Sequence, residues 1–445
     1  MQVTNQYMPT GRYETVRRNH AGREDEAGAP GPDARGTKTV VDPPMGSAPA
    51  ANETGAGSID LELAGRFALL FSGILSPFAL AGLIPVLPAI AAHFAQYPEA
   101  GFLTRLLVSM IGAMIVVGSP FVGALADRFG RRRILLIGML TYAVAGCAGF
   151  FLDNLYAVVA TRVLVGLAVA SVGAVMLAIV VTHSEGAARN RWLGYINTVG
   201  VLCTVLLIPF SGFVGHYGWQ WPFLIHAVAL PLFLLGLVGL EPDPRTVQLH
   251  VTETSVRLSG RLPWGLLAMA SAAGVLVLTP PLYVPFHLRD MGISDSRLIS
   301  VAALLTTLGA AVSAYLFGAV RARLSLTSTF ILGFGIAATG LLLNALAQSY
   351  AQIVVAQTIM GCSTGLIATN IYSLAAMTGS DSNRAQTMGL TKSSMFTGPL
   401  IGQLALEPVV KYADAGLALL LLGLFAIMLT LVQVWHAMFR QSAAA

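Results

Sequence analysis

Residues 123–133 read GALADRFGRRR and join two long apolar segments through a very short, strongly basic loop. Loops between membrane spans that are rich in Lys and Arg are retained on the cytoplasmic side. Three arginines in succession, at 131–133, give this loop a strong preference for that side. The stretch therefore predicts two transmembrane helices connected by a tight cytoplasmic turn.

The composition of the whole chain agrees with a membrane location. Hydrophobic residues make up 55% of the 445 residues and charged residues 11%, and the mean hydropathy is +0.72. A soluble domain carries about 25% charged residues. Because lipid leaves only helices and closed barrels as spanning structures, the composition predicts an all-α integral membrane protein. We assign the net charge of +5 to loops that fix topology, with no nucleic-acid partner.

Nothing in the sequence indicates an enzyme. It contains no P-loop, no Gly-x-Ser-x-Gly elbow and no Cys/His cluster with the spacing of metal ligands. Cys147, Cys203 and Cys362 lie inside apolar runs, where we expect them to pack. We therefore expect no cofactor and no metal site.

Twelve apolar runs are each long enough to cross the membrane, which takes about 20 helical residues. Residues 1–62 form a polar tail, expected to be disordered, and residues 241–262 form a polar linker; both are expected to be cytoplasmic. Residues 63–240 and 263–440 then form two six-helix bundles. The runs are 67–92, 104–125, 133–152, 155–182, 192–214, 222–240, 263–287, 297–319, 328–348, 351–377, 387–409 and 415–438.

Basic residues are unevenly divided between the two sides of these spans, which places both termini in the cytoplasm. The cytoplasmic set is Arg128, Arg131, Arg132, Arg133, Arg189, Arg191, Arg245, Arg257, Arg261, Arg321, Arg323 and Arg384. The opposite loops and their margins hold Arg105, Arg289, Arg297 and Lys411. An odd number of spans would remove this bias.

The two halves repeat with a shift of 195 residues and no gap. The shift places Pro85 on Pro280 and Arg162 on Gln357. Such duplication is typical of transporters whose two bundles rock about a binding site near the membrane midplane.

Residues 123–133 resemble the signature loop between helices 2 and 3 of the major facilitator superfamily, G-x-L-x-D-R-x-G-R-R/K, with every fixed position filled. Arg162-Val-Leu-Val-Gly166 is similar to the R-x-x-Q-G motif of the fourth helix, with Val165 in place of Gln. The resemblance covers about residues 63–440. It implies a twelve-helix fold of two pseudo-symmetric bundles, secondary transport by alternating access in a bacterial-type inner membrane, and a functional monomer.

The resemblance also implies residues that control opening of the two sides. Asp127 is expected to satisfy the positive N-terminus of helix 11 and hold the cytoplasmic side closed. Independently of the resemblance, prolines in helices 1 and 7 should kink their helices at matched places of the repeat, which suits elements of an outer gate. The expected gating residues are Gly123, Asp127, Arg128, Gly130, Arg132, Pro85 and Pro280.

Few ionisable residues lie inside the spans, and each has two interpretations. Lys392 is expected to bind an anionic group from the cavity; the alternative is that it extends back to the membrane surface. Arg162 is expected to serve gating or proton coupling, or to contact substrate directly. An anion held between these two cations would contact both bundles. Glu407 is a candidate coupling acid; the alternative is an interfacial acid paired with Lys411, four residues on.

Uncharged polar and aromatic residues complete the expected substrate site. Gln357, Asn197 and Asn370 lie on helices expected to line the cavity, and Tyr283 is placed to stack on a ring, although packing is its alternative role. Helices 1, 4, 7, 8 and 10 contain no Asp or Glu. This favours neutral or anionic cargo over cationic cargo.

The sequence therefore predicts a secondary transporter of a small organic solute, with export of an organic anion or carboxylate favoured. Protons or a counter-anion are its expected coupling partners. One alternative is a proton-coupled multidrug efflux antiporter that uses Arg162 or Glu407. An alternative of another class is a membrane sensor without transport, with the N-terminal tail as its output.

Overall fold

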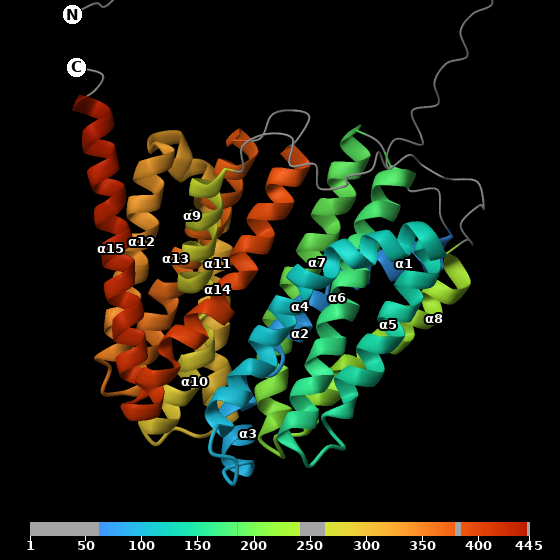
Figure 1. The fold of residues 1–445 in the computed structure, drawn as a ribbon, viewed down its shortest axis with the longest axis horizontal. Coiled ribbons are helices and arrows are strands. Elements are labelled where there is room, and N and C mark those ends of the chain that lie inside the picture. The colour runs from blue at the N-terminus through green and yellow to red at the C-terminus, as the bar shows by residue number, and fades with distance from the viewer. Residues whose placement is uncertain (1–61, 185, 241–262, 379–383, 443–445) are drawn as a thin grey trace, which may run out of the picture. The chain divides into compact units, whose positions relative to one another are not determined.

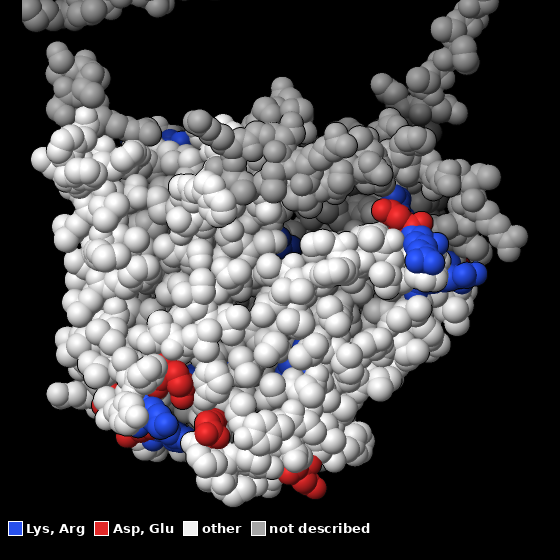
Figure 2. All heavy atoms as spheres, in the orientation of Figure 1, with Lys and Arg blue, Asp and Glu red and all other residues white. Residues whose placement is uncertain are grey.

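The computed structural model describes residues 62–184, 186–240, 263–378 and 384–442. The predicted linker and all but the last residue of the predicted tail lie outside these ranges. Within the described residues the secondary structure is entirely helical (Figure 1). Figure 2 shows charged side chains gathered at the two ends of the helices, with a broad uncharged surface between them. This surface is the expected lipid-facing band of a multi-pass membrane protein.

The helices fall into two successive sets. The first set is α1 (Leu63–Ser72), α2 (Leu75–Ala81), η2 (Ile84–Val86), α3 (Leu87–His93), α4 (Ala100–Phe129), α5 (Arg131–Ala148), α6 (Leu155–His183), α7 (Gly186–Gly215), η3 (Trp221–Val228) and α8 (Ala229–Gly239). The second set is α9 (Trp264–Leu278), α10 (Pro280–Asp290), α11 (Ser296–Arg323), α12 (Leu326–Ala345), α13 (Tyr350–Thr378), α14 (Arg384–Tyr412) and α15 (Ala415–Ser442).

Ten segments of the described chain are long and apolar enough to cross a membrane. The helices α5 and α14 are not among these ten, because α5 begins with three arginines and α14 carries Lys392, Gln403 and Glu407. Both nevertheless pack along neighbouring spans, α5 against α6 and α14 against α9. With them, the predicted twelve-helix fold is complete.

The first and seventh spans are broken at the expected prolines. Pro85 lies in the short 3-10 segment η2 between α2 and α3. Pro280 is the first residue of α10, which follows α9 after Thr279. Proline has no backbone N–H and collides with the carbonyl of the preceding turn, so it kinks or breaks a helix.

The predicted repeat reappears in the packing of each bundle. In the first bundle α6 packs on α4 and α5, and in the second α13 packs on α11 and α12. A Cβ added to Gly166 would lie 2.9 Å from the carbonyl oxygen of Ile111. A Cβ added to Gly361 would collide with the carbonyl of Thr306. Residues 111 and 306 are related by the same shift of 195 as residues 166 and 361, so the duplicated glycines make duplicated close contacts.

Gly130 connects α4 to α5 with φ 94° and ψ 139°, a backbone conformation that side chains with a Cβ rarely adopt. We expect Gly130→Ala to destabilise the folded protein by about 1–3 kcal/mol, measured as a lower melting temperature in detergent. The control is Gly335→Ala, at a position inside α12 where a Cβ would meet no atom within 4 Å. Equal melting temperatures for the two variants would contradict a conformational requirement at residue 130.

Candidate functional site

The two bundles meet along a seam formed mainly by α4 with α14 and by α7 with α11, with α10 against α3 and η2. We call the end of the bundles that carries the Gly130 turn the open end, and the opposite end the sealed end. The side-chain contacts described below join the two bundles in the half nearer the sealed end. Figure 2 shows a hollow between the bundles, with atoms of basic side chains visible in it.

A partly buried ion pair joins the bundles at the sealed end. The Nη2 atom of Arg105, on α4, lies 2.5 Å from Oε2 of Glu407, on α14. The Arg105 side chain is 1% exposed and the Glu407 side chain 28% exposed. The guanidinium carbon also lies 5.0 Å from the ring centre of Tyr283 and 5.2 Å from that of Phe286. This geometry corrects the alternative interpretation of Glu407 as the partner of Lys411.

One turn further from the sealed end, hydrogen bonds continue the contact between α4 and α14. The Ser109 hydroxyl donates to Oε1 of Gln403 at 2.6 Å, and Nε2 of Gln403 donates to the carbonyl oxygen of Phe102 at 2.9 Å. Beyond them, a Cβ on Gly112 would lie 3.5 Å from Phe396. The polar groups of this contact thus satisfy one another across the seam.

The second contact, between α7 and α11, is related to the first by the repeat. The Ser296 hydroxyl donates to the carbonyl oxygen of Gly212 at 2.8 Å, and a Cβ on Gly212 would collide with Ser300. The shift of 195 residues takes Arg105 to Ser300 and Gly212 to Glu407. The same pair of positions is therefore filled by an ion pair on one side of the seam and by close packing on the other.

Asp295, which caps the N-terminus of α11, adds a charged contact at the surface of the sealed end. Its carboxylate accepts hydrogen bonds from the backbone and guanidinium of Arg297, which lower the pKa of Asp295 to about 2. Nδ1 of His216, at the end of α7, lies 3.6 Å from Oδ1 of Asp295. Because these side chains are exposed, their contribution to stability is small.

Arg105 is the functional candidate that the sequence argument missed. The expected second span began at residue 104, which assigned Arg105 to the margin of a loop. The helix α4 begins at Ala100, so Arg105 lies more than one turn inside it. The presence of an equally isolated acid, Glu407, was the available signal, because a buried charge requires a partner.

Four glycines, one on each seam helix, lie toward the open end. A Cβ added to any of them would meet no atom within 4 Å. Each lies 18 residues, or five helical turns, from a contact residue of the sealed end. Gly123 and Gly389 correspond in this way to Arg105 and Glu407, and Gly194 and Gly318 to Gly212 and Ser300. The same helix faces that touch at the sealed end are thus apart at the open end.

The gating cluster expected around the Gly130 turn is not assembled in this structure. Asp127 and Arg128 are exposed, and Asp127 makes no hydrogen bond or ion pair with the residues that the structure describes. The guanidinium of Arg132 donates to the carbonyl oxygen of Leu237 at 2.6 Å. The expected contact of Asp127 with the N-terminus of α14 is therefore absent in the conformation described, which has its open end at this turn.

Lys392 and Asn197 occupy equivalent positions of the repeat, on α14 and α7 respectively. Each lies 15 residues from a sealed-end residue, Glu407 and Gly212 respectively, which is about 60° around the helix axis from that contact. Lys392 is one turn nearer the open end than Phe396, and both Lys392 and Asn197 are exposed. Neither forms a hydrogen bond or ion pair within the described part of the chain.

Arg162 lies inside the first bundle. Its side chain is fully buried, and Nη2 donates to the carbonyl oxygens of Ala145 at 3.0 Å and Gly146 at 3.1 Å. Its guanidinium carbon lies 5.1 Å from the ring centre of Phe223. The expected pairing of Arg162 with Lys392 around one anion is therefore not found, because Arg162 points to α5 and η3.

The remaining expected substrate residues are also buried in helix contacts. Oε1 of Gln357 accepts from Asn344 at 3.2 Å, and the Asn370 amide donates to the carbonyl oxygen of Leu326 at 3.0 Å. Both bonds join α13 to α12. Tyr283 is fully buried at the sealed end, beneath Arg105. Of the expected substrate residues, Lys392 and Asn197 are exposed, on the seam helices α14 and α7.

Parts of the sequence are similar to known membrane transporters. A stretch of 184 residues is 24% identical to the class B tetracycline resistance protein of Escherichia coli and covers 41% of this chain and 46% of that protein. A stretch of 150 residues is 28% identical to the probable sphingolipid transporter spinster homolog 1 of Arabidopsis thaliana and covers 33% of this chain and 30% of that protein. The chain thus matches less than half the length of these curated relatives.

Two solved structures share the fold. A mutant of the nucleoside transporter NupG matches with a TM-score of 0.65 at 12% identity, over 82% of this chain and 99% of that one. The inward-open xylose transporter XylE of Escherichia coli matches with a TM-score of 0.61 at 12% identity, over 83% and 94%. The family model of the Major Facilitator Superfamily matches residues 69–402. It describes transporters and not enzymes, as the sequence predicted, and this chain belongs to the major facilitator superfamily.

Proposed function

We propose that this protein is a secondary transporter that carries a small organic solute by alternating access. The observation that supports the proposal is the seam, where the two bundles touch toward one end while matched faces of the same helices are apart at the other. We infer from the basic loops and the Gly130 turn that the open end faces the cytoplasm, because basic loops are retained on that side. The conformation described is then open to the cytoplasm.

In the alternate conformation the two ends exchange roles. The contacts of Arg105 with Glu407 and of Ser300 with Gly212 separate, and the bundles close at the cytoplasmic end. The four glycines are suited to that closure, because the absence of a Cβ allows helices to approach closely. Gly123 then faces Gly389, and Gly194 faces Gly318. Asp127, Arg128 and Arg132 join this closed end, and the breaks at Pro85 and Pro280 allow α3 and α10 to move at the other.

This exchange can be tested by crosslinking a variant that carries Gly123→Cys and Gly389→Cys, with the native cysteines replaced by Ser. We expect a short thiol crosslinker to join the two cysteines only in the outward-open state, and its yield to rise when an outside ligand or antibody fragment traps that state. A control pair, Gly173→Cys on α6 and Gly335→Cys on α12, lies within separate bundles, at positions where a Cβ would meet no atom within 4 Å. The same yield in both states for the Gly123 and Gly389 pair would contradict the model of exchange.

We propose that the cargo is an organic anion, such as a carboxylate, that binds to the Lys392 ammonium. Lys392 lies on α14 one turn beyond Phe396, which is close to Gly112 of α4, and we infer that its charge faces the space between the bundles. A cation inside a span costs about 2.5–3.5 kcal/mol unless it has a cavity or a partner. Asn197 supplies a hydrogen-bonding amide from the other bundle. Cargo held between Lys392 and Asn197 would touch both bundles. We propose that the protein exports this cargo.

The buried residues have positioning roles in this proposal. Arg162 joins α6 to α5 through two backbone carbonyls, and Gln357, its counterpart in the repeat, joins α13 to α12. Asn370 adds a second link between α13 and α12. These bonds keep each bundle rigid, so that motion concentrates at the seam.

A second candidate function is proton-coupled drug efflux, supported by the position of Glu407 and by the similarity to a tetracycline resistance protein. Protonation of Glu407 would remove its attraction to Arg105 and so favour separation of the sealed end. Transport in proteoliposomes distinguishes the two candidates. An anion exporter requires Lys392 and accumulates carboxylates, whereas a drug antiporter moves cationic compounds against an imposed proton gradient without Lys392.

A further inference from the structure

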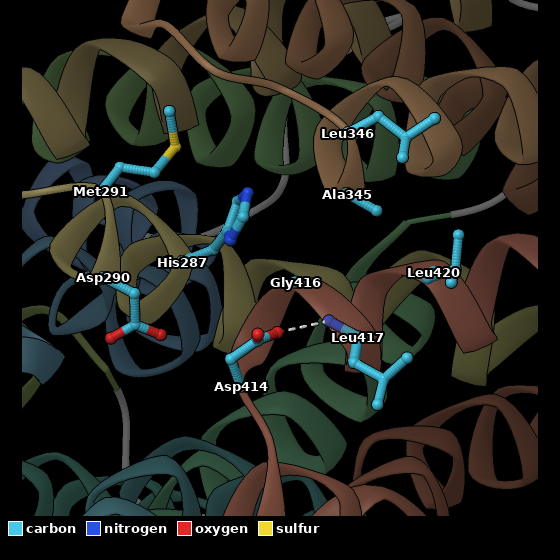
Figure 3. Close-up of a pocket in the computed structure, with 9 residues that line it drawn as sticks. All are labelled: His287, Asp290, Met291, Ala345, Leu346, Asp414, Gly416, Leu417 and Leu420. Carbon is cyan, nitrogen blue, oxygen red and sulfur yellow. Dashed lines mark hydrogen bonds between the residues drawn. The ribbon is translucent and has the colours of Figure 1, made fainter.

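A cavity lies within the second bundle, between α10, α12 and α15. It has a volume of about 400 Å³ and is bordered by the end of α10, the end of α12 and the first turns of α15. Figure 3 shows His287 and Asp290 on one side, Asp414 and Gly416 on another, and Ala345 and Leu346 across from His287. This volume lies within the range of about 300–1,000 Å³ of small-molecule sites.

His287 provides the first sign of a ligand. Its side chain is 9% exposed, and its Nε2 atom has no hydrogen-bond partner among the described residues. Buried polar groups in folded proteins almost always have such a partner. The imidazole lies against Gly416, where an added Cβ would come within 3.1 Å of Nδ1 of His287 and 3.2 Å of Oδ1 of Asp414. The imidazole and the Asp414 carboxylate thus border the same small space.

The charges around His287 select a cation. Asp290 and Asp414 contribute two carboxylates, and of the described residues that line the cavity none is Lys or Arg. Asp414 uses Oδ1 to cap α15 by accepting from the backbone N–H of Leu417 at 2.7 Å. Asp290 is partly balanced by Arg289, at 3.2 Å. A ligand with N–H donors can therefore bind the exposed Asp414 carboxylate beside the imidazole, with Asp290 adding negative charge at the rim of the same cavity.

A metal ion does not fit this arrangement. Within the described chain, no three His, Cys, Asp or Glu side chains lie close enough together to hold one metal ion. The carboxylates are instead accompanied by apolar side chains, including Leu346 and Leu420. A ligand that satisfies both features has an ammonium group and a short apolar portion.

We propose that this cavity is a second binding site, specific for a primary ammonium ion with an apolar substituent. Asp290 and Asp414 lie at the ends of two spans, Trp264–Asp290 and Ala415–Phe439, so the ammonium group comes either from a soluble amine or from the headgroup of an aminophospholipid. The ligand bridges α10 to α15. Because α10 also contacts α3 and η2 across the seam, an occupied site stabilises the sealed end. This proposal stands independently of the cargo proposed for Lys392.

The test is a calorimetric titration of the purified full-length protein in detergent with phenethylammonium chloride. We expect saturable binding that weakens at least tenfold in Asp414→Asn, a change that removes the charge but keeps a residue that caps a helix well. Gly416→Ala should weaken binding similarly, because its Cβ presses on the imidazole. Asp153→Asn, at an exposed acid of the first bundle, should bind like the wild type.

Two results would overturn the proposal. One is equal affinity in the wild type and Asp414→Asn, which would place any binding elsewhere, including the seam. The other is equally tight binding of uncharged 2-phenylethanol, which would remove the requirement for an ammonium group. Nanodiscs then identify the source of the ligand. Weaker phenethylammonium binding in phosphatidylethanolamine than in phosphatidylcholine assigns the site to the lipid headgroup, and equal binding assigns it to a soluble amine.

Discussion

Glu407→Gln is expected to open the sealed end and to abolish most transport. The change leaves the Arg105 guanidinium buried at 1% exposure without its counter-charge, and removal of one partner of a buried pair costs about 3–5 kcal/mol. The protein can avoid this cost by separating α4 from α14, which admits water to Arg105. The measurement is the distance between spin labels on exposed positions of α4 and α14 near the sealed end, which should lengthen in the variant.

Lys411→Ala provides the matched control for this experiment. Lys411 lies four residues after Glu407 and is exposed, and we expect no change in the distance between α4 and α14 when it is removed. The exchange of charges, Arg105→Glu with Glu407→Arg, should restore part of the sealed population because it re-forms an ion pair. An unchanged distance in Glu407→Gln, or the same change in Lys411→Ala, would show that the ion pair with Arg105 does not hold the seam together.

Lys392→Ala is expected to lower the affinity for carboxylate cargo by about 10- to 100-fold. A hydrogen bond to a charged group contributes about 1.5–3 kcal/mol, and each 1.4 kcal/mol corresponds to a factor of ten in the dissociation constant. Lys392→Arg should retain most of the affinity because the positive charge remains. The measurement is a thermal-shift titration of purified protein with small carboxylates, siderophore-like acids and cationic drugs, since a ligand that binds the folded state raises its melting temperature.

Asn197→Ala tests the other side of the same site. If cargo is held between the two bundles, this variant should lose about 1 kcal/mol of binding free energy, the typical contribution of an uncharged hydrogen bond. Gln357→Ala and Asn370→Ala should instead lower stability with little direct effect on affinity, because both side chains are buried between α12 and α13. Carboxylate binding that is equal in wild type, Lys392→Ala and Lys392→Arg would mean that Lys392 extends to the membrane surface and takes no part in binding.

Much of the fold could be predicted from the sequence because its signals are local. A spanning helix satisfies its own backbone hydrogen bonds, so its position follows from a run of apolar residues. The internal repeat could also be recognised from the sequence, because matched residues recur at a constant offset. Gly166 and Gly361 each allow a close helix contact, and both halves retain the glycine at the same offset. The exact helix starts were less certain, and the error of a few residues at Ala100 concealed Arg105.

The candidate site was only partly predictable. Lys392 and Asn197 were identified as polar residues within spans, and both are exposed on seam helices; their role in binding stays a prediction. Arg162 and Gln357 satisfied the same criterion, yet their side chains bond within their own bundles. Hydropathy reports that a polar residue lies inside a span, but it does not report the direction of its side chain around the helix axis. That direction becomes defined only when neighbouring helices pack.

The sequence by itself determined the membrane location, the helical spans and the two related halves, because each depends on residues that are close together along the chain. The tertiary structure alone decided which charges meet. Arg105 and Glu407 are 302 positions apart, and their pairing depends on how one bundle docks against the other. The tertiary structure also decided that the two bundles touch at one end of the seam in this conformation. The two ends are built from the same helix faces, so their relative free energies depend on contacts between bundles that no local pattern records.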